Sequence, residues 1–189
     1  MDWKTYYQER HLTADEAVKH IKSGNRVLVG HACGEPSFLL DTMIGHKEDY
    51  ENVEIVHMVA MGKCEYCQPG MEKHFHHNAY FVGARTRDAI NSGCGDETFH
   101  TTMPLDVALV SVTPPDENGM VSLGVSVDYD YEAVMTAKIV IAQVNDQMPF
   151  TYGKLIPVDK FTYFVDYSAP IIELAPPKIG PIEEAIGKY

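Results

Sequence analysis

Apolar runs and amphipathic segments alternate along most of the chain. Compact apolar runs predict five strands, and helical spacing predicts four short helices between or beside them. The strands are expected at 26–30, 52–61, 79–83, 105–112 and 138–145, and the helices at 13–21, 37–45, 86–93 and 128–137. Because strands that alternate with helices form parallel sheets, the pattern predicts an α/β fold with an open, largely parallel sheet flanked by helices.

The remaining segments predict shorter elements. Residues 114–124 (PPDENGMVSLG) are typical of a turn followed by a hairpin. Residues 149–180 contain five prolines and only short apolar runs, which favours small strands in a Pro-rich connecting arm. A last helix is expected from Pro181. We therefore predict an α/β domain at 1–150, and at 151–189 a connecting arm and the start of a helix that lead to a part of the protein absent from this chain.

The composition is that of a globular protein with an acidic balance. Of 189 residues, 45% are hydrophobic, and the formal net charge is -12 at pH 7. This charge opposes binding to nucleic acids and anionic lipids by long-range repulsion. No apolar run reaches the ~18 residues that a membrane span needs, and the first residues lack the pattern of an export signal. The sequence therefore predicts a cytoplasmic protein with reduced cysteines that binds neither nucleic acids nor membranes.

Candidate binding residues lie where the first predicted strand ends. The turn GHACGEP joins this strand to a helix, and open α/β sheets bind ligands at the carboxyl ends of their strands. Glycines allow a ligand to approach the backbone closely, and N–H groups at a helix start favour an anion such as a carboxylate. The candidates in this turn are Gly30, His31, Gly34 and Pro36. Alternatively the turn only reverses the chain, and Glu35, whose charge would repel an anion, is expected to interact with the helix dipole.

Two further strand ends supply candidates by the same rule. His57, Met61 and Gly62 follow the second predicted strand, although packing in the core is an equal alternative for the histidine and the better one for the methionine. Asn145 and Gln147 follow the fifth strand, where their amides could position a carboxylate. Alternatively Asn145 only binds backbone groups where the strand ends.

A cysteine pair with nearby histidines raises the question of a metal. Cys64 and Cys67 are spaced as Cys-x-x-Cys, a pattern available to tetrahedral zinc, and His74, His76 and His77 follow. The spacing of the histidines is not that of a zinc finger, and these residues run directly into a predicted strand. We therefore expect no metal site and interpret the segment as a loop over the binding cleft, with a zinc-binding or interaction module as the alternative of another class.

Residues 111–153 (SVTPPDENGMVSLGVSVDYDYEAVMTAKIVIAQVNDQMPFTYG) resemble the acetyl-CoA hydrolase/transferase family, and most closely its 4-hydroxybutyrate and butyrate:acetate CoA-transferase members. The same proteins have sequences similar to three further segments of this chain, residues 13–36, 57–75 and 176–189. The resemblance covers nearly the whole chain but only the first of the two α/β domains that the family contains. It departs after Gly95, where the family has a longer segment before the next core strand.

The resemblance implies a CoA-transferase in which a glutamate of the second domain forms a thioester with CoA. No glutamate of this chain matches that residue, so no catalytic residue is assigned here and the chain alone is expected to be inactive. The resemblance further implies CoA as a substrate, no tightly bound cofactor, short carboxylic acids such as 4-hydroxybutyrate, butyrate or acetate, and a homo-oligomer. Lys63, Arg85 and Arg87 could meet the phosphates of CoA or be solvated surface charges. An acyl-CoA hydrolase on the same scaffold remains the close alternative.

Overall fold

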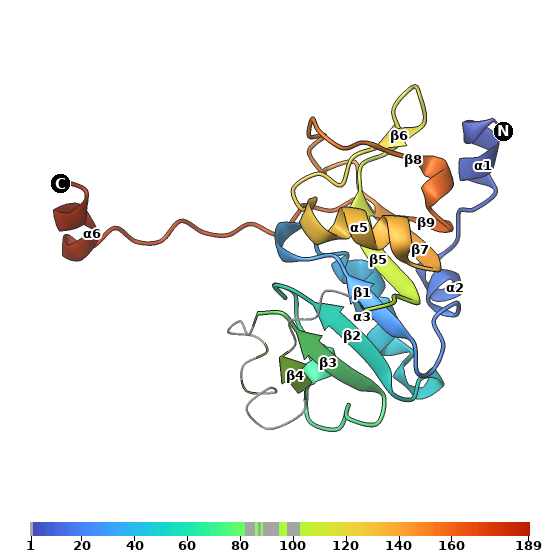
Figure 1. Cartoon of the computed structure of the whole chain (residues 1–189), viewed down its shortest axis with the longest axis horizontal. Helices are drawn as coiled ribbons and strands as arrows, with labels where there is room; N and C mark the ends of the chain where they lie inside the picture. Colours follow the sequence, from blue (N-terminus) through green and yellow to red (C-terminus); the bar gives the residue numbers. More distant parts are fainter. Residues whose placement is uncertain (1, 82–85, 87, 89–94, 98–102) are drawn as a thin grey trace.

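An open sheet of seven parallel strands forms the centre of the part of the chain that the structure describes. The computed structural model describes residues 2–81, 86, 88, 95–97 and 103–189 (Figure 1). The strands of the sheet are β1 (Arg26–Val29), β2 (Val53–His57), β3 (Phe75–Ala79), β4 (Gly95–Glu97), β5 (Val107–Val112), β7 (Ile139–Val144) and β9 (Tyr163–Asp166). Their order across the sheet is β4-β3-β2-β1-β5-β7-β9. The predicted open, parallel α/β sheet is confirmed.

The direction in which strands are added reverses beside β1. From β1 the chain adds β2, β3 and β4 on one side, and then β5, β7 and β9 on the other. Val27 of β1 accordingly pairs with Ile55 of β2 and with Val107 of β5. Ligands of open α/β sheets bind at such a reversal, outside the carboxyl ends of the strands. The turn that follows β1 therefore occupies the position where a ligand is expected.

Helices cover both faces of the sheet (Figure 1). The α-helices are α1 (Trp3–Gln8), α2 (Ala14–Val18), α3 (Ser37–Gly45), α5 (Asp128–Thr136) and α6 (Pro181–Ile186), and the short 3-10 helices are η1 (Ala32–Gly34), η2 (Lys47–Asp49), η3 (Glu65–Cys67) and η4 (Val158–Lys160). No helix among the described residues is both long and apolar enough to cross a membrane. Thr13 caps the start of helix α2 in a capping box, in which the side chains of Thr13 and Glu16 each bind the other residue's backbone N–H.

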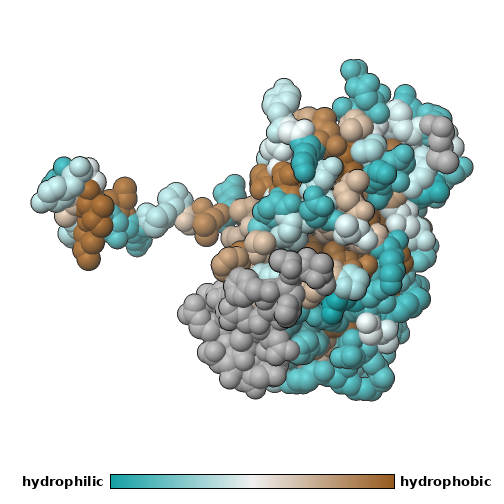
Figure 2. Space-filling model, viewed as in Figure 1, coloured by the Kyte–Doolittle hydropathy of each residue, from teal (hydrophilic) through white to brown (hydrophobic). Residues whose placement is uncertain are grey.

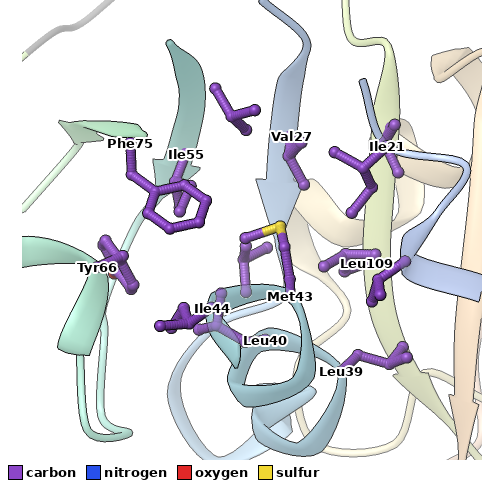
Figure 3. Close-up of a cluster of buried hydrophobic side chains, with 14 of the residues drawn as sticks. Ile21, Val27, Leu39, Leu40, Met43, Ile44, Ile55, Tyr66, Phe75 and Leu109 are labelled. Carbon is purple, nitrogen blue, oxygen red and sulfur yellow. The ribbon is translucent and has the colours of Figure 1, made fainter. Parts of the chain in front are cut away.

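Two hydrophobic clusters fill the space between the sheet and its helices. On one face, Leu39 and Met43 of α3 pack against Val27 and Leu109 of the central strands (Figure 3). On the other face, Ala133 of α5 belongs to a second cluster with alternate residues of the same strands. Both faces of the central strands are therefore buried, which explains their nearly continuous apolar sequences.

The third strand lies earlier than predicted. It was expected at 79–83, but β3 runs from Phe75 to Ala79 and contains the polar sequence FHHNA. These polar side chains have partners in the interior: the His77 ring lies 3.2 Å from Cys67 Sγ, and Asn78 donates to Glu54 over 2.7 Å. Tertiary contacts that local hydropathy does not reveal therefore determine the position of this strand.

Two other expectations need correction. The hairpin predicted at 114–124 instead forms β6 (Met120–Val121), which pairs antiparallel with the distant β8 (Ile156–Pro157). Strand β9 was expected to lead away from the domain, but it pairs in parallel with β7 and adds an edge to the main sheet. The helix predicted at 86–93 falls mostly outside the described residues.

The end of the chain extends away from the sheet (Figure 1). Residues 167–180 contain no helix or strand, and they lead to the short helix α6. Leu174, Ile179, Ile182 and Ile186 on this segment are exposed apolar side chains (Figure 2). The division of the chain at residue 150 stays a prediction, and the pairing of β9 favours a later end of the α/β domain.

Candidate functional site

The turn between β1 and α3, residues 30–36, lies at the strand reversal. The Gly30 N–H donates to Leu109 O of β5 over 2.8 Å, and the Ala32 N–H donates to Val59 O, beyond β2, over 2.9 Å. Ala32 has a φ of 53°, in the left-handed region that residues other than glycine rarely adopt. Contacts to the neighbours of β1 on both sides thus fix the path of the turn.

The start of α5 also holds this turn. Ser126 Oγ donates to His31 O over 2.8 Å, and the Tyr129 hydroxyl donates to Val29 O over 2.6 Å. The His31 Nε2 lies 2.9 and 2.8 Å from the two carboxylate oxygens of Asp128. Gly34 is packed so closely that a Cβ there would lie 2.7 Å from Ser126 Cβ. The residues that open α5 therefore orient both the backbone of the turn and the His31 ring.

Asp130 is a buried carboxyl group next to the turn. Burial, together with the nearby charge of Asp128, raises the pKa of Asp130 well above its usual value. Its Oδ1 has no hydrogen-bond partner among the described residues. A Cβ on Gly30 would lie 3.1 Å from the Oδ2 of Asp130. The glycine therefore allows the strand end to pass close to this carboxyl group.

Glu35 joins the turn to the loop after β2. Its Oε2 accepts from the Met61 and Gly62 N–H groups, each over 3.0 Å, and its Oε1 accepts from the Ser37 hydroxyl over 2.9 Å. Its side chain is only 1% exposed. Two of its three donors come from the loop after β2 and one from Ser37, the first residue of α3, so the predicted interaction with the helix dipole stays a prediction. The carboxylate therefore ties the start of α3 to the loop after β2.

His57, at the end of β2, is a neutral buried histidine. Burial lowers its pKa to about 3, and the nearby rings of His77 and His31 add to this effect. The Nδ1 atom lies 3.0 Å from the Tyr66 hydroxyl, and the Nε2 atom lies 3.6 Å from Glu35 Oε2. Because the imidazole is neutral at pH 7, this last contact is not an ion pair. The Nε2 atom has no hydrogen-bond partner among the described residues.

A pocket of about 200 Å³ lies beside the turn at the carboxyl ends of the strands. Its lining comes from four parts of the chain: the turn, the start of α3, the ends of β5 and β7, and the segment after β9. The lining residues are Cys33, Glu35, Ser37, Phe38, Asp41, Ser111, Gln143, Asn145, Met148, Tyr167 and 169–172. The turn thus borders a hollow large enough for a small molecule.

Of the lining residues, only Asn145 was a predicted candidate, and two of the others are polar residues of the central strands. Ser111 and Gln143 lie opposite each other on β5 and β7, and both are buried. Each is a polar residue inside an otherwise apolar strand, which is a signal that the sequence contains. Such residues need either a partner or a ligand, because burying an unpaired polar group is costly.

The structure brings some of the predicted binding residues together and separates others. Asn145 lines the pocket, but its Nδ2 donates to Ala169 O over 2.7 Å and its Oδ1 accepts from the Gln147 and Ala169 N–H groups. The alternative role of Asn145, binding backbone groups at the strand end, therefore applies. Gln147 itself is exposed. The remaining candidates form or support the turn and are not lining residues of this pocket: Gly30, His31, Gly34, Pro36, His57, Met61 and Gly62.

The cysteine and histidine segment packs against the core instead of covering the pocket. Cys64 and Cys67 are buried in the hydrophobic cluster that contains the apolar residues of α3, and neither lines the pocket. His74 Nδ1 lies 2.9 Å from Tyr50 O. Among the described residues, no group of three or more His, Cys, Asp or Glu side chains is arranged to hold a metal ion. Lys63 pairs with Asp41 over 2.7 Å, and Arg85 and Arg87 lie outside the described residues.

Known proteins resemble this chain over its whole length. The 4-hydroxybutyrate coenzyme A transferase of Clostridium kluyveri is 47% identical and matches 100% of this chain, which corresponds to 47% of that protein. The succinyl-CoA:cyclohexane-1-carboxylate CoA transferase of Geobacter metallireducens is 30% identical over 97% of this chain and 44% of its own length. The chain therefore spans about half the length of the curated relatives that it matches.

A solved structure gives the same result. The crystal structure of 4-hydroxybutyrate CoA-transferase from Porphyromonas gingivalis has a TM-score of 0.77 and 34% identity, covering 94% of this chain and 44% of that one. The sequence pattern of the acetyl-CoA hydrolase/transferase N-terminal domain matches residues 1–174. A match over most of the chain, with the parallel sheet and strand reversal described above, shows that this chain belongs to the acetyl-CoA hydrolase/transferase family, as its N-terminal domain.

Proposed function

We propose that this chain is the amino-terminal half of a transferase that moves CoA between an acyl-CoA and a short carboxylic acid. The observation that carries the proposal is the 47% identity to 4-hydroxybutyrate coenzyme A transferase along the entire chain. The acid is 4-hydroxybutyrate, with butyrate or acetate as further substrates. The pocket beside the β1–α3 turn supports the proposal, because it offers room for a small acid at the strand reversal.

The proposed reaction is covalent catalysis by a glutamate of the second domain. The carboxylate oxygen attacks the thioester carbon, the C–S bond breaks, and the CoA thiolate leaves an acyl-glutamyl anhydride. The thiolate then attacks the glutamyl carbonyl carbon, which releases the first acid and leaves a glutamyl-CoA thioester. The second acid repeats these steps in reverse. Each addition places negative charge on a carbonyl oxygen, which preorganised N–H donors stabilise.

This chain would contribute the surface against which the substrate is positioned in such a site. The turn is rigid because Glu35, Asp128 and Ser126 hold it, so it could position a substrate without rearranging. No glutamate of this chain is assigned as the nucleophile. The chain alone is therefore expected to be inactive, and its partner is a second α/β domain. A cytoplasmic location and a homo-oligomer belong to the same proposal.

Complementation tests the proposal directly. The chain is mixed with a separately produced carboxyl-terminal half of the Clostridium kluyveri transferase, and transfer of CoA from butyryl-CoA to 4-hydroxybutyrate is followed by chromatography. We expect no transfer by either half alone and transfer by the mixture. Transfer by this chain alone would overturn the placement of the nucleophile. Halves that elute as one complex but transfer no CoA would overturn the transferase proposal.

A hydrolase on the same scaffold is distinguished within this experiment. The family includes acetyl-CoA hydrolases as well as transferases. In a hydrolase, water instead of a second acid would react with the glutamyl-CoA thioester. Release of free CoA by the mixture at the same rate with and without added acid would identify a hydrolase, whereas loss of butyryl-CoA that requires the acid and yields the CoA ester of that acid supports a transferase.

A further inference from the structure

The pocket beside the turn has a polar floor and an apolar wall. The floor contains Ser111 and Gln143, which pair in register on β5 and β7 and are each 4% exposed. The wall contains Phe38 and Tyr167, whose rings stack with centroids 4.1 Å apart, and Met148. A ligand that fills this pocket must therefore combine an apolar body with a group that forms hydrogen bonds.

The floor retains unused hydrogen-bonding capacity. Gln143 Oε1 accepts from the Leu39 N–H over 3.2 Å, but no described residue accepts from its Nε2. The Ser111 hydroxyl likewise has no hydrogen bond to any residue that the structure describes. Neither atom is among the fully buried side-chain atoms that lack a partner, so both are open to the pocket. The free amide N–H groups of Gln143 and the hydroxyl of Ser111 are thus available to a ligand.

The charges around the pocket favour a neutral ligand group. Its lining residues, all of them described, include no lysine or arginine. They include two carboxylates, which are already occupied: Glu35 accepts from three donors, and Asp41 pairs with Lys63. An acid that placed its own carboxylate here would gain no cation and meet two like charges. A hydroxyl group, which donates and accepts, suits Ser111 and Gln143 better.

We infer that this pocket binds the acyl chain of a short hydroxylated acid, with Ser111 and Gln143 forming hydrogen bonds to the hydroxyl group of that chain. The volume suits this class of chain, because a cavity of about 150 Å³ is known to hold a benzene molecule. The inference rests on the proposed function and names the residues that select the acid.

Titration with two neutral amides tests the inference on the chain as it exists. The probes are 4-hydroxybutyramide and butyramide, which differ only in the hydroxyl group and lack the charge of the free acids. Binding is followed by ¹H–¹⁵N NMR, in which the side-chain amide of Gln143 gives its own signals. We expect 4-hydroxybutyramide to shift these signals and to bind about tenfold more tightly than butyramide, the effect of one net hydrogen bond.

Two variants complete the experiment. Ser111→Ala should reduce the preference for the hydroxylated amide to about twofold or less without unfolding the chain, because it removes one oxygen. Ser23→Ala removes a hydroxyl that binds the Glu51 N–H on the exposed surface and should leave the preference unchanged. Equal affinity of the unaltered chain for both amides, or shifts away from Gln143, would overturn the inference. If the mixed halves transfer CoA but the chain binds both amides equally, the pocket assignment alone is overturned. If the chain binds the hydroxylated amide selectively but the mixed halves transfer no CoA, only the proposed function is overturned.

Discussion

Glu35 concentrates three hydrogen bonds on one buried carboxylate. Replacing it with alanine leaves the Met61 and Gly62 N–H groups and the Ser37 hydroxyl without their acceptor. Each buried donor without an acceptor costs about 1–3 kcal/mol. We expect Glu35→Ala to lower the free energy of unfolding by about 3 kcal/mol or more, measured by urea denaturation.

Glu117→Ala is the matched control for this loss. Glu117 is an exposed residue of the turn before β6, and its replacement should change the free energy of unfolding by less than about 0.5 kcal/mol. Equal stability of the two variants would show that the Glu35 carboxylate does not hold the loop after β2.

His57 makes stability depend on pH. Its pKa is lowered from 6.5 to about 3 by burial, so the unfolded chain takes up this proton at a higher pH than the folded chain does. The stability that neutral His57 provides is therefore complete above about pH 6.5 and is lost as the pH falls towards 3, by about 1.4 kcal/mol per pH unit. We expect His57→Asn to reduce the slope of stability against pH by this amount between pH 4 and 6.

The difference between the two proteins isolates this residue. His77, whose pKa burial lowers to about 4, and the acidic residues contribute to the slope of both proteins and cancel in the comparison. The measurement is urea denaturation at intervals of half a pH unit. Parallel curves for the two proteins would contradict a neutral, buried His57.

Single residues also show which features of the site the sequence could predict and which it could not. The position of the turn was predictable, because GHACGEP follows an apolar strand and precedes a helical pattern. The role of Glu35 was not, because its partners Met61 and Gly62 lie 26 and 27 residues away and become neighbours only in the folded sheet. Ser111 and Gln143 could have been found, since a polar residue inside a buried strand requires an explanation.

At the scale of elements, helix α5 buries a carboxyl group in its first turn. Burial and the charge of Asp128 raise the pKa of Asp130 well above its usual 3.8, so the folded chain keeps this proton longer than the unfolded chain. Its contribution to stability is therefore complete below pH 3.8 and is lost as the pH rises towards the folded pKa. We expect Asp130→Asn to stabilise the chain at pH 8, by about 1–3 kcal/mol, and much less at pH 4.

Asp159→Asn is the matched control for Asp130→Asn. Asp159 is an exposed acid in η4, and its replacement should leave stability nearly unchanged at both pH values. Thermal unfolding of the three proteins at pH 4 and pH 8 makes the comparison. A stabilisation by Asp130→Asn that is the same at both pH values would exclude a titrating carboxyl group beside Gly30.

Elements with a clear period were predicted well, and those that depend on distant partners were not. Helix α3 has the predicted bounds because 37–45 places apolar residues on one face. Strand β3 was predicted too late, because its polar residues are buried against Cys67 and Glu54, which no local pattern reveals. Strand β6 pairs with β8, about 35 residues further along the chain, and does not form the predicted local hairpin.

At the scale of the whole molecule, the sheet and the final segment differ in what they bury. Phe164 and Val165 of β9 are buried, and Phe164 and Tyr7 of α1 lie with ring centroids 4.5 Å apart. By contrast, residues 173–179 and 181–189 are exposed throughout. Apolar side chains such as Ile182 and Ile186 thus remain available on this segment, and the proposed second domain is the partner that could bury them.

Two truncations test where the folded unit ends. Removing residues 173–189 takes away almost no buried surface. We therefore expect the melting temperature to change by less than about 2 °C and the urea dependence of the free energy of unfolding to stay nearly the same. Removing residues 161–189 deletes β9 and exposes the edge of β7, so we expect loss of cooperative unfolding or a soluble yield that falls sharply. Both variants are compared with the unaltered chain by calorimetry. If the shorter truncation destabilised the chain as much as the longer one, residues 173–189 would have to pack on the sheet in solution, and they could not serve as a free arm towards a second domain.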